Sequence, residues 1–204
     1  MRVISLDAAG YAANSYLIVC DAAKEFAVVD PGVDTAPAKP LFDAGYTLRY
    51  VLLTHGHFDH ILYLDQWRAC GGKVCIHRRD AEFLGDPTKS LYLQFFSLDK
   101  KHADADVLLC DGDKLLLGDT EISVMSTPGH TGGSVCYLFE DSMISGDTLF
   151  YGSIGRTDLY GSDEGEMMAS IEKLSKLKTN YTVYPGHGGK TTLDREKKYG
   201  YLHD

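Results

Sequence analysis

Four residues that can bind a metal ion fall within six consecutive positions of the sequence. They are His55, His57, Asp59 and His60, in the run Thr54-His55-Gly56-His57-Phe58-Asp59-His60. An extended backbone would place His55 and His57 on one side, and a turn into a following helix would present the other two nearby. Neutral imidazoles and a carboxylate suit Zn²⁺, Fe²⁺ or Mn²⁺. The run therefore predicts a site for a divalent metal.

A second pattern places His or Asp where an apolar strand ends in a tight turn. It occurs five times, at Asp30, His55, His130, Asp147 and His187. Proline stops a strand, and glycine permits positive φ and a close approach of the backbone, so the side chain at such a turn has a defined direction. If these strand ends share one edge of a sheet, we expect their side chains to converge there.

Each of these turns, taken alone, has a simpler explanation, because the ring of a Pro-Gly-His turn can face solvent. The whole set favours metal binding, since nothing structural requires three more directed side chains beside a cluster of four. Seven candidate ligands exceed one tetrahedral shell, so we predict two ions that share Asp147. We expect His77, His102 and His203, which lie outside the pattern, at the surface or hydrogen-bonded in the core.

Short strands and a few helices must position these side chains. Apolar runs and turn residues predict strands over 2–6, 15–20, 26–29, 50–53, 74–77, 114–117, 121–126, 135–139, 142–145 and 181–184. Helices are predicted over 34–44, 62–69 and 164–177, with a terminal helical turn. Strands with interspersed helices in both halves predict an α/β sandwich of two sheets flanked by helices.

The segment 81–106 is apolar at helical spacing. It contains Leu91, Leu93, Phe95, Phe96 and Leu98, and we expect one or two short helices. Apolar stripes of this kind usually pack on the core. The segment could also form a lid over the metal site, and the two arrangements are compatible.

Composition limits the class of protein. With 204 residues, 44% hydrophobic and 24% charged, the chain fits a single globular domain over 1–204. The net charge of -9 and the absence of basic clusters larger than a pair argue against nucleic acid and favour a small-molecule substrate. No apolar run is long enough to span a bilayer and the start does not resemble a signal peptide, so we expect no membrane partner and a cytoplasmic location. Oligomeric state stays open.

Five cysteines are scattered at 20, 70, 75, 110 and 136, mostly inside apolar runs. Such residues are typical of reduced thiols in a core. The spacing of Cys70 and Cys75 matches neither a redox pair nor a zinc knuckle, so no chemistry is assigned to them.

The motifs of the chain resemble those of the metallo-β-lactamase superfamily. They are, in the expected order, residues 54–60, Pro128-Gly129-His130-Thr131, Gly146-Asp147-Thr148-Leu149-Phe150 and Pro185-Gly186-His187-Gly188. The resemblance covers essentially the whole chain and implies a four-layer αββα sandwich. Through residues 145–158 the chain is most similar to small glyoxalase II-like (hydroxyacylglutathione hydrolase-like) bacterial hydrolases.

The resemblance also implies roles for single residues. One metal would be bound by His55, His57 and His130, the other by Asp59, His60 and His187, with Asp147 bridging. Asp59 and Asp147 would serve catalysis, Asp30 would be a supporting carboxylate, and Arg156 and Tyr151 would contact the substrate. The ions would be Zn²⁺, with Fe²⁺ or Mn²⁺ as alternatives.

Three departures from the relatives bear on the substrate. True β-lactamases of this fold often have Cys where Asp147 stands, which argues against antibiotic hydrolysis. Many relatives follow the last ligand of the cluster with Ile-Gly-Gly, whereas this chain has Ile61-Leu62-Tyr63, so we expect a bulkier wall near the second metal. Asp158 replaces a Tyr and would repel a glutathione carboxylate unless it pairs with Arg156, so we expect glutathione to be a poorer partner.

The predicted activity is hydrolysis of a thioester. Two metals would lower the pKa of a bridging water to about 7, and the resulting hydroxide would attack the carbonyl without a protein nucleophile. A thiolate leaves readily because the pKa of a thiol is about 8.5. Alternatives are an iron-dependent persulfide dioxygenase, which shares the fold and a similar Gly-Arg-Thr-Asp stretch, and a lactonase or phosphodiesterase. A non-catalytic metal-binding module would be expected to lack a ligand, and this chain lacks none.

Overall fold

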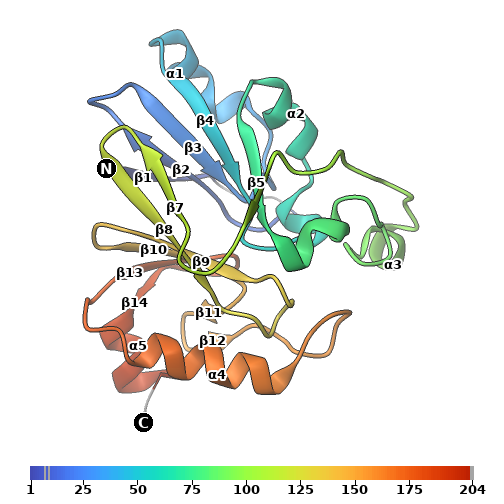
Figure 1. The fold of residues 1–204 in the computed structure, drawn as a ribbon, viewed down its shortest axis with the longest axis vertical. Helices are drawn as coiled ribbons and strands as arrows, with labels where there is room; N and C mark the ends of the chain where they lie inside the picture. The colour runs from blue at the N-terminus through green and yellow to red at the C-terminus, as the bar shows by residue number, and fades with distance from the viewer. Residues whose placement is uncertain (7, 9, 203–204) are drawn as a thin grey trace.

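Two six-stranded sheets pack against each other, and helices cover the outer face of each sheet (Figure 1). The computed structural model describes residues 1–6, 8 and 10–202. The N-terminal half of the chain forms the first sheet, and the C-terminal half forms the second.

The first sheet follows the order of the chain. Its strands are β1 (Arg2–Leu6), β2 (Ser15–Cys20), β3 (Glu25–Val29), β4 (Thr47–Leu52), β5 (Lys73–His77) and β6 (Val107–Leu109). β1 to β3 are antiparallel, whereas β3 to β6 run parallel. The connections between the parallel strands contain η1 (Ala36–Ala38), α1 (Lys39–Asp43), η2 (Phe58–His60), α2 (Leu64–Ala69), η3 (Arg78–Phe83) and α3 (Tyr92–Phe96).

The second sheet has the order β14-β13-β10-β9-β8-β7. Its strands are β7 (Lys114–Leu117), β8 (Thr120–Ser126), β9 (Val135–Phe139), β10 (Ser142–Gly146), β13 (Thr182–Pro185) and β14 (Thr191–Thr192). β10 and β13 are parallel, and their crossover contains the hairpin β11 (Leu149–Phe150) and β12 (Ser153–Ile154), followed by α4 (Glu164–Ser175). The helix α5 (Leu193–Tyr199) follows β14.

Three apolar cores separate the four layers. In β2, Leu17 and Val19 face the core under α2, with Trp67, whereas Tyr16 and Ile18 face the core between the sheets. This alternation buries both faces of the strand. The third core lies between the second sheet and helices α4 and α5. The predicted four-layer αββα sandwich is confirmed.

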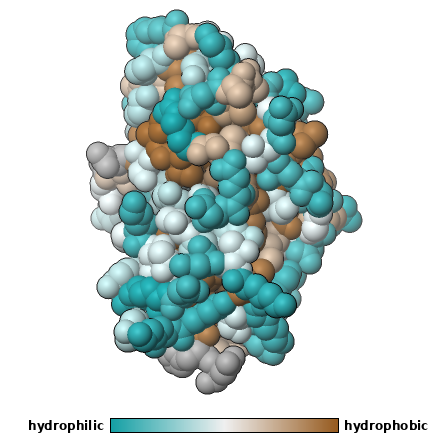
Figure 2. Space-filling view, turned by 90° about the vertical axis from the view of Figure 1, so that its left-hand side faces the viewer, coloured by the Kyte–Doolittle hydropathy of each residue, from teal (hydrophilic) through white to brown (hydrophobic). Residues whose placement is uncertain are grey.

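Helix α4 shows why the outer layer is polar. Met167, Ile171 and Leu174 are buried against the second sheet, and most of the other side chains of the helix are exposed. In the lower part of Figure 2, at the height where α4 and α5 lie in Figure 1, the surface is mostly hydrophilic. Within the described residues, no helix combines the length and the apolar character needed to cross a membrane.

The predicted strands agree with the structure to within three residues at each end, and several agree at both ends. The helix predicted over 34–44 is divided into η1 and α1 around Pro37 and Pro40, because proline cannot donate the backbone hydrogen bond that a longer helix needs. The predicted terminal turn is a seven-residue helix. Strands β6, β11, β12 and β14 were not predicted, since two or three residues show no periodicity.

Candidate metal centre

The candidate ligands lie at one end of the sandwich, where loops from both sheets meet. The loop after β4 carries His55, and the loops after β8, β10 and β13 carry His130, Asp147 and His187. The candidate ligands converge, but they do so from the facing ends of two sheets rather than from one sheet edge. Backbone hydrogen bonds join those ends, with Val135 N donating to Thr54 O at 2.9 Å.

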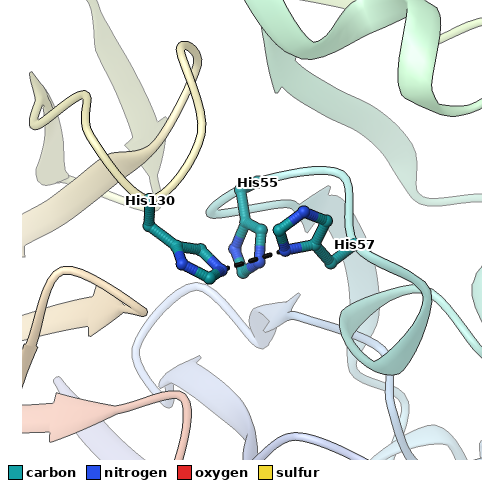
Figure 3. A group of neighbouring side chains, drawn as sticks. All are labelled: His55, His57 and His130. Atoms are coloured by element: carbon teal, nitrogen blue, oxygen red, sulfur yellow. Dashed lines mark hydrogen bonds between the residues drawn. The ribbon is translucent and has the colours of Figure 1, made fainter. Parts of the chain in front are cut away.

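Three histidines form the first group (Figure 3). His55 and His57 come from one loop and His130 from the opposite loop, and their rings point toward a common centre. The extended backbone of His57, with φ -73 and ψ 149, places it on the same side as His55, as the sequence predicted. His57 Nδ1 lies 2.9 Å from His130 Nε2.

The second group consists of Asp59, His60 and His187, whose candidate ligand atoms lie within 4.8 Å of one another. The turn η2 presents Asp59 and His60 directly after the first cluster. His187 Nε2 lies 3.1 Å from Asp59 Oδ2. The three residues that the resemblance assigns to a second ion are thus brought together.

Asp147 lies between the two groups. Its Oδ1 is 3.4 Å from His60 Nε2, and its Oδ2 is 3.5 Å from both His130 Nε2 and His187 Nε2. A Cβ at position 186 would lie 2.1 Å from Asp147 Oδ1, so Gly186 is required for the carboxylate to occupy this place. One carboxylate therefore reaches both groups of ligands.

Partners outside the centre fix the orientation of three imidazoles. The Nδ1 atoms of His55, His60 and His130 contact, respectively, Thr54 Oγ1 at 3.1 Å, Asp30 Oδ2 at 2.8 Å and Arg156 O at 2.9 Å. Each contact uses Nδ1 and leaves Nε2 directed at the centre. Asp30, predicted as a supporting carboxylate, also accepts hydrogen bonds from Thr54 N and Thr54 Oγ1, each at 2.7 Å.

The donor atoms at the centre fit a divalent cation. His55 Nε2, His60 Nε2 and Asp147 Oδ1 are buried and have no hydrogen-bond partner among the described residues. An unpaired buried polar atom costs about 1–3 kcal/mol, and a metal ion would satisfy all three. Imidazole nitrogen and carboxylate oxygen together suit Zn²⁺, Fe²⁺ or Mn²⁺. The cluster is suited to bind divalent metals.

Two histidines of the first group, His55 and His57, are held neutral. Burial lowers the pKa of His55 well below its usual value, and the neighbouring His60 lowers it further. Burial and the neighbouring His130 lower the pKa of His57 to about 3. Neutral imidazoles keep a lone pair on the nitrogen that faces the centre, which is the form that binds a metal.

In the second group, neighbouring carboxylates keep His60 and His187 protonated. Burial alone would raise the pKa of Asp147, but the charge on His60 and the contact with His187 lower it well below the usual value. Hydrogen bonds to Asp147 and Asp59 raise the pKa of His187 to about 9. Protons on these histidines balance the carboxylates, and a bound cation would replace them.

Asp80 is a buried carboxylate that the sequence did not indicate. It accepts hydrogen bonds from Gly56 N at 3.1 Å, Thr131 Oγ1 at 2.7 Å and Gly133 N at 2.7 Å. It therefore joins the loop of His55 and His57 to the loop of His130. These partners lie 24 to 53 positions away in the chain, so no local pattern marks the residue.

A cavity of about 510 Å³ opens over the centre. It is lined by Gly10, Tyr11, Ala12, His57, Phe58, Asp59, Leu91, Phe95, His130, Asp147, Phe150, Ile154, Arg156, Leu159 and His187. Leu91 and Phe95 come from the segment 81–106, and Leu91 also packs on the core, as expected for an apolar stripe. The lid stays a prediction.

Of the two residues predicted to contact the substrate, one lines the cavity and the other does not. Arg156 lines the cavity, with Nε and Nη2 donating to Asp158 at 2.6 and 2.8 Å, so the pairing considered for Asp158 is present. Tyr151 lies outside the cavity, in the turn after β11, with the guanidinium of Arg195 3.6 Å from its ring centroid, whereas Phe150 lines the cavity. The bulkier wall expected at 61–63 is absent from the described lining, since Ile61 is buried in the core.

The remaining predictions for His and Cys concern the core. His77 and His102 are buried, and their rings contact Ser126 Oγ and the Asp65 carboxylate, respectively, as expected for satisfied histidines. His203 lies outside the described residues. All five cysteines are free, but Cys70 is exposed and Cys110 is half-buried, so the prediction of core thiols holds for the other three.

Known proteins share this architecture. The sequence model of the metallo-beta-lactamase superfamily matches residues 8–187. The "Probable metallo-hydrolase YqgX" of Bacillus subtilis (strain 168) is 34% identical, over 91% of this chain and 89% of that protein.

Two solved structures are also similar. BLEG-1, described as a B3 metallo-beta-lactamase, superposes with a TM-score of 0.91 at 35% identity over 100% of both chains. TTHA1623, described in a di-iron-bound form, superposes with a TM-score of 0.79 at 30% identity over 98% of both chains.

Proposed function

The chain belongs to the metallo-beta-lactamase superfamily, and on that premise we propose that it is a metal-dependent hydrolase whose substrates are thioesters. The observation that carries the proposal is the position of Asp147, which reaches both groups of ligands at the base of an open cavity. The name of the Bacillus relative, a metallo-hydrolase, supports the general activity.

The lining of the cavity supports hydrolysis by water. Among the described residues that line it there is no Ser, Thr, Cys or Lys, so the protein offers no conventional nucleophile there. A pair of bound divalent ions would lower the pKa of water and polarise the carbonyl of a substrate. The seven ligands would hold two Zn²⁺ ions, or Fe²⁺ or Mn²⁺, and the di-iron form of TTHA1623 makes iron a candidate.

The chain's own residues have three tasks in this reaction. Asp59 and Asp147 face the cavity and fix the ligand shell. Asp30 and the carbonyl of Arg156 hold His60 and His130 in place through their Nδ1 atoms. Apart from Tyr11 and Arg156, every polar side chain among the described lining residues is a candidate metal ligand, so few groups are free to protonate a leaving group. This favours a thiolate, because a thiolate needs little protonation at neutral pH.

β-Lactam hydrolysis is the second candidate function. It is favoured by the similarity to BLEG-1, which is described as a B3 metallo-beta-lactamase. The presence of Asp147 in place of the Cys of many β-lactamases led us to expect otherwise, and the two observations point in opposite directions. The same assay decides between them.

The test is a hydrolysis screen on protein of known metal content. We expect turnover of acetyl and butanoyl thioesters, loss of activity after chelation, and recovery when Zn²⁺, Fe²⁺ or Mn²⁺ is restored. The variant Glu121→Gln, which changes an exposed carboxylate on β8, serves as the control and should retain activity. Preferential cleavage of a β-lactam such as nitrocefin, or oxygen uptake with glutathione persulfide as the sole activity, would overturn the thioester assignment.

A further inference from the structure

The helix α3 leaves apolar side chains in solvent beside the cavity. Leu93, Phe95 and Phe96 are 40%, 49% and 43% exposed, whereas Tyr92 on the same helix is buried. Single exposed apolar residues are ordinary, but a contiguous group at the edge of a cavity marks a binding surface.

Two of these residues belong to a group of four aromatic side chains, which we call the aromatic wall. Its members are Tyr11, Phe58, Phe95 and Phe96. The ring centroid of Phe58 lies 5.2 Å from that of Phe95 and 5.1 Å from that of Phe96. Tyr11 stands edge-on to Phe96, with 5.6 Å between their centroids. The four side chains thus form a continuous apolar surface.

The aromatic wall is continuous with the metal centre. Phe58 follows His57 and precedes Asp59 in the sequence, and all three line the cavity together with Tyr11 and Phe95. An apolar group bound on the aromatic wall would therefore lie directly beside a substrate bond that is held at the candidate metal ligands. This continuity makes a part of the substrate, rather than a separate partner, the occupant of the wall.

Buried contacts fix the position of α3. Leu91 before the helix and Ser97 after it have φ values of 69 and 52, the left-handed region that such residues rarely adopt. The hydroxyl of Tyr92 lies 3.2 Å from His102 Nε2 inside the core. The exposed rings are consequently held in place by the buried part of the same segment.

The cavity offers little to a charged substrate. Arg156 is the single Lys or Arg among its described lining residues, and that guanidinium is already paired through two hydrogen bonds with Asp158. Binding the carboxylates of a peptide such as glutathione would require breaking this pair. An apolar chain needs no such exchange.

We propose that the substrate carries an apolar chain of several carbons next to the scissile carbonyl and that this chain binds on the aromatic wall. The proposal rests on the proposed hydrolysis of thioesters and narrows its substrate class. The apolar chain can belong to the acyl part or to the thiol part of the thioester, and the experiment distinguishes the two.

The experiment measures kcat/KM for two series of thioesters with the metal-loaded protein. One series lengthens the acyl chain from acetyl to hexanoyl on a constant thiol, and the other lengthens an alkyl thiol on a constant acetyl group. We expect kcat/KM to rise by about threefold per methylene in one series. Phe95→Ala should reduce the total gain at least fivefold, and Leu116→Ala, an exposed apolar residue on β7 outside the cavity, should leave it unchanged.

A binding measurement keeps the inference independent of turnover. Titration calorimetry with butanoate, hexanoate and octanoate on the metal-loaded protein should show affinity increasing with chain length, and Phe95→Ala should remove most of the increase. If no thioester is hydrolysed but carboxylate affinity still increases with chain length and depends on Phe95, the proposed reaction is overturned while binding of an apolar chain on the aromatic wall is supported. Equal rates along both series and equal affinities for the three carboxylates would overturn the aromatic wall while the reaction stands.

Discussion

Among single residues, Asp80 shows how a side chain outside the ligand set can support it. Its carboxylate holds the backbone of Gly56 and Gly133 and the hydroxyl of Thr131, which belong to loops that deliver His57 and His130. Burial raises the pKa of Asp80 to about 6, although these hydrogen bonds lower it. The residue therefore combines a positioning role with a cost in stability at neutral pH.

We expect Asp80→Asn to reduce the pH dependence of stability. Because the pKa of the carboxyl is higher in the folded state than its ordinary value of 3.8, its contribution to stability is complete at low pH and is lost as pH rises through about 6. The loss amounts to about 3 kcal/mol by pH 7. Urea unfolding of wild type and variant at pH 4.5 and 7 measures this directly.

As pH increases, the unfolding free energy of wild type should fall relative to that of Asp80→Asn. The same measurement on Asp111→Asn, an exposed carboxylate whose pKa is lowered by Ser126 N and Lys173 against the effect of burial, should give a nearly constant difference, because that carboxyl is ionised in both the folded and the unfolded state between pH 4.5 and 7. A constant difference between wild type and Asp80→Asn across this range would show that Asp80 does not titrate as described.

The candidate ligands stand out in the sequence because their signals are local. His55, His57, Asp59 and His60 share one short run, and a Gly-containing turn marks His130, Asp147 and His187. Asp80 carries no such signal, because its partners are brought near by folding. Phe150 rather than Tyr151 lines the cavity because Tyr151 lies in the turn after β11, and a two-residue strand leaves no pattern in the sequence from which its end could be predicted.

At the level of elements, α3 depends on buried contacts rather than on its own length. Five residues are too few for a stable isolated helix. The imidazole of His102 contacts the hydroxyl of Tyr92 through Nε2, and it contacts the carboxylate of Asp65 through Nδ1 at 3.0 Å. This chain of contacts links α3 to α2 beneath the aromatic wall.

Replacing His102 with Ala should loosen α3. We expect a loss of about 1–2 kcal/mol in unfolding free energy and faster hydrogen exchange at the amides of Phe95 and Ser97. The control is His77→Ala, which removes another buried histidine, one that contacts Ser126 on β8. Equal acceleration in both variants, or none with His102→Ala, would contradict this role of His102.

Element types were predictable where a strand or helix was long enough to show a period, as in β8 and α4. The division of ligand-bearing strands between two sheets was not predictable, because an apolar strand end looks the same whichever sheet it joins. Pairing is decided by contacts such as those of β10 with β13, which lie about forty residues apart in the chain.

For the whole molecule, the candidate metal centre belongs to neither half alone. The first sheet delivers His55, His57, Asp59 and His60, and the second delivers His130, Asp147 and His187. The pattern of strands and helices was sufficient to predict two sheets flanked by helices. The closeness of the two sheet ends, held by contacts such as Tyr137 hydroxyl to Leu53 O at 2.8 Å, could come only from the folded structure.

The measurement that tests this account most directly is the metal content of purified protein, wild type and Asp147 variants, by elemental analysis after saturation with Zn²⁺. We predict about two ions per chain in wild type and in Glu121→Gln, and weaker binding at both sites in Asp147→Ala, with Asp147→Asn as a second variant that preserves side-chain volume. Circular dichroism confirms that each variant is folded. Saturation of wild type at one ion, or full binding of two ions with unchanged affinity in both Asp147 variants, would contradict a centre bridged by Asp147.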